Sequence, residues 1–291
     1  MAGIVFIFVA AAVVILGFVV LGLTDGHRMT SRDLAWLAGD RVYSAAAADT
    51  YRAYLRRHSL ARLIGGALGI AVGIIIALRW RDDWSWSVQV GFGVPIHTNI
   101  LVWWLFGVTL GTLMSESYRL FARHDSGVRR AALNARPPRP LPRLTWAARV
   151  ILAVTILGAV AAVVLREGAS GTLAGALLAL LLVGLAEATQ AAITDRPRPV
   201  SEPAATVDER LRWFAGTSVA WLELTGAILG LTTAIVGWST VWSERYRLGL
   251  TPIWVTAANA VAVLVVLACT VTGVVAILRS RVRPPWGWQP A

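Results

Sequence analysis

Three acidic residues lie inside or at the edge of long apolar stretches of this chain, where a charged side chain is costly. Glu223 lies near the middle of one stretch, and Glu187 and Glu116 lie near the ends of two others. A charge at the centre of a bilayer costs roughly 2.5–3.5 kcal/mol on insertion-based scales, so we expect Glu223 to face another helix rather than lipid. Carboxyl groups at different depths suit a stepped path for protons or cations.

Each of these acids also has a purely structural interpretation. Ion pairs with arginines such as Arg119 or Arg149 account for Glu116 and Glu187, and we favour that interpretation for both. For Glu223, a functional role and a specific buried hydrogen bond remain equal alternatives. The candidate partners of Glu223, which complete the predicted polar path, are Gln190, Thr256 and Asn259.

The basic residues exclude several kinds of chemistry. All 27 are arginine, and no lysine occurs anywhere in the sequence. Without lysine there is no Walker A phosphate loop and no Schiff base to pyridoxal phosphate or retinal. Cys269 is the single cysteine, which excludes an internal disulfide and a cluster of thiolate metal ligands.

The histidines do not form a recognisable catalytic or metal motif. They are spread along the sequence, and we expect none of them inside a membrane-spanning helix, which argues against haem ligation. No nucleophile elbow or His-Glu-x-x-His sequence is present. We therefore expect no metal, no cofactor and no enzymatic activity. The four residues are His27, His58, His97 and His124.

The elements that must position the acids are membrane-spanning helices. Hydrophobic residues make up 57% of the chain, and several apolar runs reach the roughly 20 residues needed to cross a bilayer. We predict an all-α polytopic integral membrane protein with a single transmembrane domain over residues 1–291. Its seven predicted spans are 3–23, 60–80, 99–118, 146–165, 171–193, 213–238 and 252–278.

The seven spans suggest a first helix followed by three helical hairpins. Arginine–proline segments follow the third, fifth and seventh spans, and tetrapeptides that begin with Arg-Leu and end with Trp, at 143–146 and 210–213, open the fourth and sixth. A real internal repeat would produce this plan, and so would the ordinary composition of membrane-flanking segments.

Small residues recur at four-residue spacing on several spans, which permits close approach of two helices. Glycines at this spacing indicate packing surfaces and say little about a substrate. On the sixth span, glycines also fall on the helical face that carries Glu223. The predicted packing glycines are Gly65, Gly69, Gly73, Gly107, Gly111, Gly226 and Gly230.

Two segments between the spans have patterns of their own. Residues 30–57 predict a cytoplasmic helix on the membrane surface, with a solvated linker helix as the alternative. Residues 84–94 alternate apolar with small or polar residues, which favours an extracellular β-ribbon that docks a partner over an irregular interfacial loop. The apolar positions of this ribbon are Trp84, Trp86, Val88, Val90, Phe92 and Val94.

The charge distribution predicts the sidedness and the partners of the chain. The net charge is +11, and 22 of the 27 arginines lie on one side of the predicted spans. Positive charge is retained in the cytoplasm, so the N-terminus is expected outside and the C-terminus inside. Because the arginines flank apolar runs, anionic lipid headgroups are the expected partners rather than nucleic acid.

These features predict a membrane component of a transport or export system in a bacterial inner membrane. The expected role is that of a permease-like subunit that works with other proteins or with copies of itself. The alternative is a membrane scaffold or accessory subunit without transport activity, whose glycine faces and ribbon bind other proteins.

Overall fold

The computed structural model describes residues 31–39, 44–79, 87–90, 94–121, 141–165, 169–195, 202–247 and 253–280. Apart from one short hairpin, these residues are almost entirely helical. Five of the described helices are long and apolar enough to cross a membrane, which fits a membrane protein. Their membrane-length segments are Ala45–Ile75, Pro142–Leu165, Gly171–Asp195, Ala205–Trp238 and Ala260–Arg279.

The order of elements follows most of the predicted spans. The predicted run 3–23 lies outside the described residues, and the predicted span 99–118 falls on one of the helices, α4. The total of seven spans therefore stays a prediction. The elements are α2 (Ser31–Ala38), α3 (Ala45–Arg79), β1 (Ser87–Val90), β2 (Val94–His97), α4 (Thr98–Phe121), α5 (Pro142–Leu165), α6 (Ala169–Asp195), α7 (Glu202–Arg247) and α8 (Ile253–Arg279).

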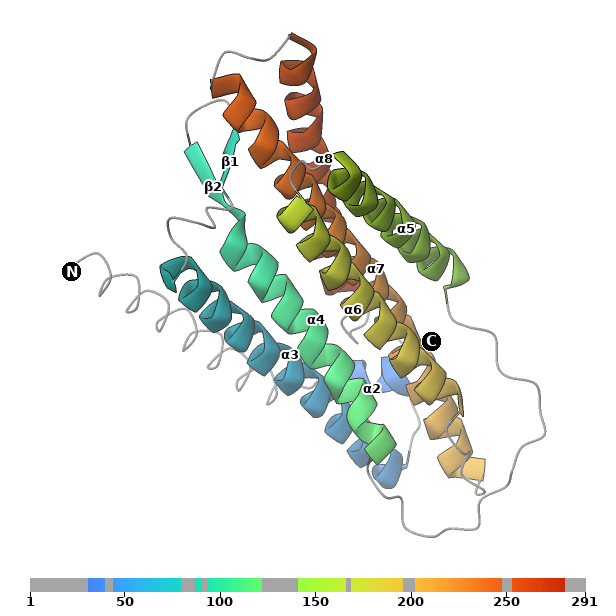
Figure 1. Cartoon of the computed structure of the whole chain (residues 1–291). Helices are drawn as coiled ribbons and strands as arrows, with labels where there is room; N and C mark the ends of the chain where they lie inside the picture. Colours follow the sequence, from blue (N-terminus) through green and yellow to red (C-terminus); the bar gives the residue numbers. More distant parts are fainter. Residues whose placement is uncertain are drawn as a thin grey trace, which may run out of the picture.

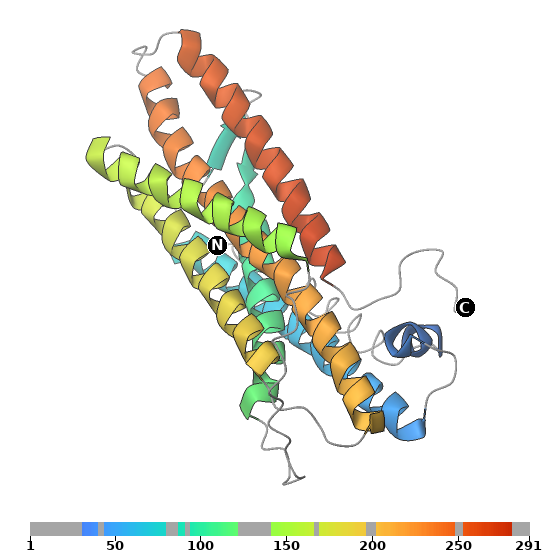
Figure 2. The same ribbon diagram turned by 90° about the vertical axis from the view of Figure 1, so that its right-hand side faces the viewer.

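Helix α7 is the central element of an elongated bundle (Figure 1). It contacts α2, α4, α5, α6 and α8. In its most apolar stretch, 83% of the residues are buried, against 22% in the corresponding stretch of α5. Figure 2 shows α5 lying across the outside of α6 and α7. Other helices bury only a small part of the α5 surface. Most of the apolar side chains of α5 therefore face outward, as expected for a helix in contact with lipid.

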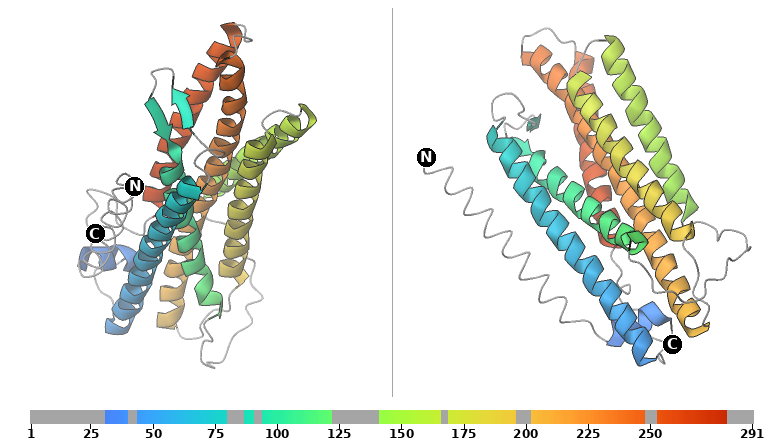
Figure 3. Two further views of the ribbon diagram at one scale, coloured as in Figure 1. Left: turned by 60° about the vertical axis from the view of Figure 1, so that its left-hand side comes forward. Right: turned by 60° about the horizontal axis from the view of Figure 1, so that its bottom comes forward.

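Helices α3 and α4 form a close antiparallel pair, seen side by side in Figure 3. A Cβ atom added to Gly107 would lie 2.8 Å from the Cα atom of Gly69, and one added to Gly111 would lie 3.0 Å from the Cα atom of Gly65. The backbones of the two helices therefore touch directly, as the four-residue spacing predicts. Gly73 lies farther along the same face, against the side chain of Trp103.

A second close contact joins α6 and α7. Gly230 lies against Gly175 and Ala179, and Gly226 lies against the side chain of Leu182. Both α7 glycines had been predicted to pack against another helix. Gly171 and Gly237, whose backbones touch farther along this contact, were not singled out from the sequence because they fall at the ends of the two runs.

The single helix expected over 30–57 is wrong, because this segment contains two helices, and its position on a membrane surface stays a prediction. Helix α2 stops at Gly39, which has a φ of 74° and whose amide donates to the carbonyl of Ala35 over 2.8 Å. Ser44 then caps the start of α3, accepting a hydrogen bond from the Ala47 amide. From there α3 continues without interruption into the predicted span.

The tyrosines of this segment are buried inside the protein, whereas a helix lying on a membrane would turn them towards the lipid headgroups. Tyr51 and Tyr54 are 2% and 1% exposed. They belong to a small apolar core between α2, the beginning of α3 and the beginning of α7. Burial in this core explains why the helices extend beyond the predicted spans. Its buried members are Leu34, Leu37, Tyr51, Tyr54, Leu55, Leu211 and Phe214.

Strands β1 and β2 pair antiparallel just before α4, with Ser87 opposite His97 and Val90 opposite Val94. Val88 lies on β1 of this hairpin. The predicted ribbon covers 84–94, and three of its apolar residues, Trp84, Trp86 and Phe92, lie outside the described residues. The extracellular position of the ribbon and its contact with a partner stay predictions.

Candidate functional site: buried polar groups within the helical bundle

Glu223 lies in the most buried part of the bundle. Its side chain is on α7 and is 1% exposed. Its chain neighbours Leu222 and Leu224 are also buried, and one helical turn farther on Ala227 is fully covered. The expectation that this acid faces protein instead of lipid is consistent with that position.

Arg149 of α5 forms an ion pair with an acid on a neighbouring helix. Its Nε atom donates a hydrogen bond to Oε1 of Glu187 on α6 over 2.8 Å, and its Nη2 atom contacts the same oxygen. The sequence had suggested Arg149 as an ion-pair partner, and the structure places it against Glu187. This ion pair therefore joins α5 to α6.

The other predicted members of the polar path are only partly accounted for. Gln190 of α6 is 4% exposed, and its Oε1 atom accepts no hydrogen bond from the part of the chain that the structure describes. Thr256 and Asn259 lie on α8, and their side chains lie outside the described part of the chain. A hydrogen bond from any of these residues to Glu223 stays a prediction.

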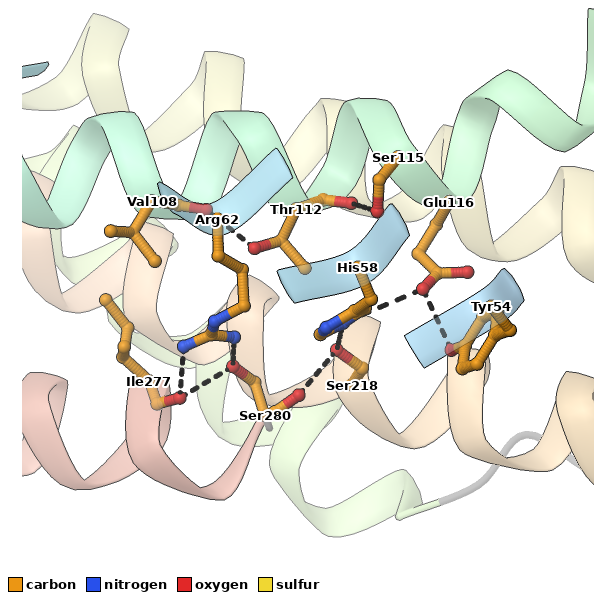
Figure 4. A network of polar contacts seen from close by, with 10 residues as sticks. All are labelled: Tyr54, His58, Arg62, Val108, Thr112, Ser115, Glu116, Ser218, Ile277 and Ser280. Carbon is orange, nitrogen blue, oxygen red and sulfur yellow. Dashed lines mark hydrogen bonds and ion pairs between the residues drawn. The ribbon is translucent and has the colours of Figure 1, made fainter. Parts of the chain in front are cut away.

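A separate polar network lies near the end of the bundle that also carries α2. Three side chains on α3, spaced four residues apart, point to one face of that helix: Tyr54, His58 and Arg62 (Figure 4). The Tyr54 hydroxyl donates to Oε1 of Glu116 on α4 over 2.9 Å, and Nε2 of His58 lies 3.7 Å from the same oxygen. His58 and Glu116 are 4% and 3% exposed, so both groups are removed from solvent.

The same network reaches the last turn of α8. Arg62 donates from Nη1 to the hydroxyl of Ser280 over 2.6 Å and from Nη2 to the carbonyl of Ile277 over 2.7 Å. Ser218 of α7 donates to the carbonyl of Ser280 over 2.9 Å and lies 3.3 Å from Nε2 of His58. A positive charge against these carbonyls favourably opposes the dipole of α8. Four helices are thus joined by buried hydrogen bonds.

An arginine holds the end of α6 in the same way. Arg212 of α7 donates from Nη1 to the carbonyl of Ile193 over 3.0 Å, and its Nε atom donates to Asp208 over 2.6 Å. Arginines that the sequence marked as topology signals therefore also bind helix ends. The positive charge of each guanidinium group opposes the negative end of the helix dipole, and its several N–H donors reach the carbonyl oxygens there.

Two expectations about this network were wrong. Glu116 was expected to reach the headgroup layer, but its carboxylate is buried and accepts a hydrogen bond from Tyr54, and its pairing with an arginine stays a prediction. His58 was expected outside the helix interiors, but it lies within α3, in a membrane-length segment. The four-residue spacing of Tyr54, His58 and Arg62 was the available signal. It was missed because this part of the chain was assigned to a surface helix.

No protein family model matches this chain, and neither a curated protein nor a solved structure matches it. The chemistry of the site must therefore be inferred from its geometry. Among the described residues, no group of three or more His, Cys, Asp and Glu side chains is arranged to hold a metal ion. The groups that are present suit the binding of protons, because carboxyl and imidazole groups exchange them readily.

Replacement of Tyr54 by phenylalanine tests the contact with Glu116. The change removes only the hydroxyl, so we expect a loss of about 1.5–3 kcal/mol, as for a hydrogen bond to a charged group. Unfolding of the purified protein in mixed detergent and SDS micelles, followed by circular dichroism, measures it. Tyr51→Phe, in the same apolar core, is the matched control. Equal losses in the two variants would show that the hydroxyl of Tyr54 has no special role.

Proposed function

We propose that this protein is a membrane component of a transport or export system, in which Glu223 binds and releases a proton or cation during transport. The observation that carries the proposal is the position of Glu223, which is 1% exposed on the most buried helix of the bundle. A carboxyl group at such a position is costly, and acids inside membrane bundles commonly belong to ion or proton pathways.

The link from Glu223 to neighbouring helices supports this role. Helix α7 packs against both α5 and α6, so a proton or cation bound at Glu223 would change the charge buried within the packing of these helices. We expect the attraction between these helices to depend on the occupancy of Glu223. Transport requires such a dependence of helix packing on a bound ion.

The proposal includes the setting inferred from the sequence. The protein lies in a bacterial inner membrane with its N-terminus outside and its C-terminus in the cytoplasm, in contact with anionic lipids. It works with other subunits or as a homo-oligomer. The polar network and the end of α8 lie towards the side that the arginine distribution assigns to the cytoplasm.

The second candidate is a scaffold or accessory subunit without transport activity. The exposed apolar face of α5 favours it, since Trp146, Leu157 and Val164 are 69%, 68% and 73% exposed. Such a face can receive a partner helix as well as lipid. Copurification of a stable complex through this face, without ion flux, would favour the scaffold.

Ion flux through reconstituted vesicles tests the transport proposal. Protein in liposomes loaded with a pH-sensitive dye should carry protons when a potassium diffusion potential is imposed, and Glu223→Gln should reduce the flux to that of empty liposomes. Glu209→Gln is the matched control, because Glu209 is an exposed acid on the same helix. Equal flux in wild-type protein and folded Glu223→Gln protein would refute a role for this acid.

A further inference from the structure

We propose that His58 of α3 and Glu116 of α4 form a second proton-binding site, in which one exchangeable proton binds either to the imidazole ring or to the carboxyl group. This site involves neither Glu223 nor Arg149, and the inference stands whether or not the protein transports ions. It follows from the 3.7 Å separation of His58 Nε2 and Glu116 Oε1 and from the burial of both groups. A proton on either member leaves the pair with no net charge, which is the least costly state in a buried position.

The hydrogen bonds around the site determine where one hydrogen lies. A serine hydroxyl has a single hydrogen to donate. Ser218 donates it to the carbonyl of Ser280, so its oxygen must accept from Nε2 of His58. The imidazole therefore carries a hydrogen on Nε2, and an additional proton on the ring must bind Nδ1.

The hydrogen bonds around Glu116 are compatible with both its ionised and its protonated form. When it is ionised, its Oε1 atom accepts from the Tyr54 hydroxyl and faces the Nε2 hydrogen of His58. When it is protonated, the neutral acid faces a neutral imidazole that still donates to Ser218. The proton thus resides either on Nδ1 of His58 or on the carboxyl group of Glu116, and the surrounding hydrogen bonds suit both states.

The charged groups around the pair come from both helices that carry it. Arg57 and Arg62 flank His58 on α3, one residue before it and four residues after it, and Glu116 approaches from α4. The network residues on α7 and α8 are the neutral Ser218 and Ser280 (Figure 4). The two arginines lower the energy of the state in which the pair has lost its proton and carries one negative charge. Release of the proton is therefore feasible, as exchange requires.

Nuclear magnetic resonance of histidine nitrogens in detergent micelles tests the hydrogen positions. The protein has four histidines, and the signals of His58 are those that disappear in His58→Gln. We expect the neutral His58 ring to carry its hydrogen on Nε2. A neutral ring with its hydrogen on Nδ1 would contradict the assigned network.

Mutual displacement of the two titrations tests the shared proton. Glu116→Gln should displace the titration midpoint of His58 by about one pH unit or more, and His58→Gln should displace that of the Glu116 carboxyl carbon by a similar amount. Glu209→Gln should leave both midpoints unchanged. Unchanged midpoints in folded Glu116→Gln and His58→Gln proteins would overturn the proposal.

A more conservative substitution, Tyr54→Phe, tests the same site if Glu116→Gln or His58→Gln does not fold. Tyr54→Phe retains both titrating groups and removes only the donor to Glu116 Oε1. The midpoint of Glu116 should move in this variant, while the Nε2 hydrogen of His58 stays in place. An unmoved Glu116 midpoint would count against the proposal, because a group that exchanges its proton must respond to the loss of that donor.

Discussion

Replacing Gly107 by alanine is expected to lower the free energy of unfolding by about 3 kcal/mol, at the upper end of the range for an overpacked core. The new methyl group would lie 2.8 Å from the Cα atom of Gly69 and would also meet the carbonyl oxygen of Gly65. Both are backbone atoms, which cannot turn away as a side chain can. Helices α3 and α4 would therefore have to move apart where Gly107 meets Gly65 and Gly69.

Gly158→Ala is the matched control for this prediction. Gly158 also lies within a helix, but no atom lies within 4 Å of an added Cβ at this position. Alanine is favoured over glycine inside a helix by roughly 0.5–1 kcal/mol, so this variant should be as stable as the wild type or slightly more stable. Unfolding in SDS-containing micelles measures both variants. Equal stabilities for the two would show that the glycine contact does not hold α3 to α4.

Replacing Arg62 by leucine is expected to cost about 2–3 kcal/mol and to loosen the end of α8. The guanidinium group makes two hydrogen bonds, to Ser280 and to the carbonyl of Ile277, and both partners are buried. Hydrogen bonds to charged groups contribute roughly 1.5–3 kcal/mol each, and part of this is offset because the buried charge is also removed.

Hydrogen exchange separates a local effect from a global one. In Arg62→Leu, amide hydrogens in the last turns of α8 should exchange faster, while those in the middle of α6 should be less affected. Arg62→Lys retains the charge but not the two-pronged geometry, so it should fall between the wild type and Arg62→Leu. Unchanged exchange at the end of α8 in Arg62→Leu would refute the proposed link between α3 and α8.

The contrast between Glu187 and Glu116 shows how far sequence reasoning extends. Both are acids near the end of an apolar run, and both were expected to pair with an arginine. For Glu187 the expectation named Arg149, which does bind it. Glu116 instead accepts a hydrogen bond that was not predicted, from Tyr54, which is 62 residues away in the sequence on a neighbouring helix. The two acids differ in which helix lies opposite, and a single sequence does not specify that.

The long beginning of α7 is a second case of this kind. The predicted span 213–238 marks its apolar part, but α7 runs from Glu202 to Arg247 and is about 69 Å long at 1.5 Å per residue. Its first turns remain helical because Leu211 and Phe214 pack into the small core with Tyr51 and Tyr54. Hydropathy measures transfer into lipid, and it cannot detect burial against a distant part of the same chain.

The sequence by itself determined the apolar helices and the faces on which they approach each other. In a bilayer each backbone amide needs a partner inside its own segment, so long apolar runs become helices, and the absence of a Cβ is a local property of glycine. Only the tertiary structure decided the polar network. Its hydrogen bonds join residues 62, 160 and 218 positions apart, and they depend on which helices become neighbours when α3, α4, α7 and α8 pack.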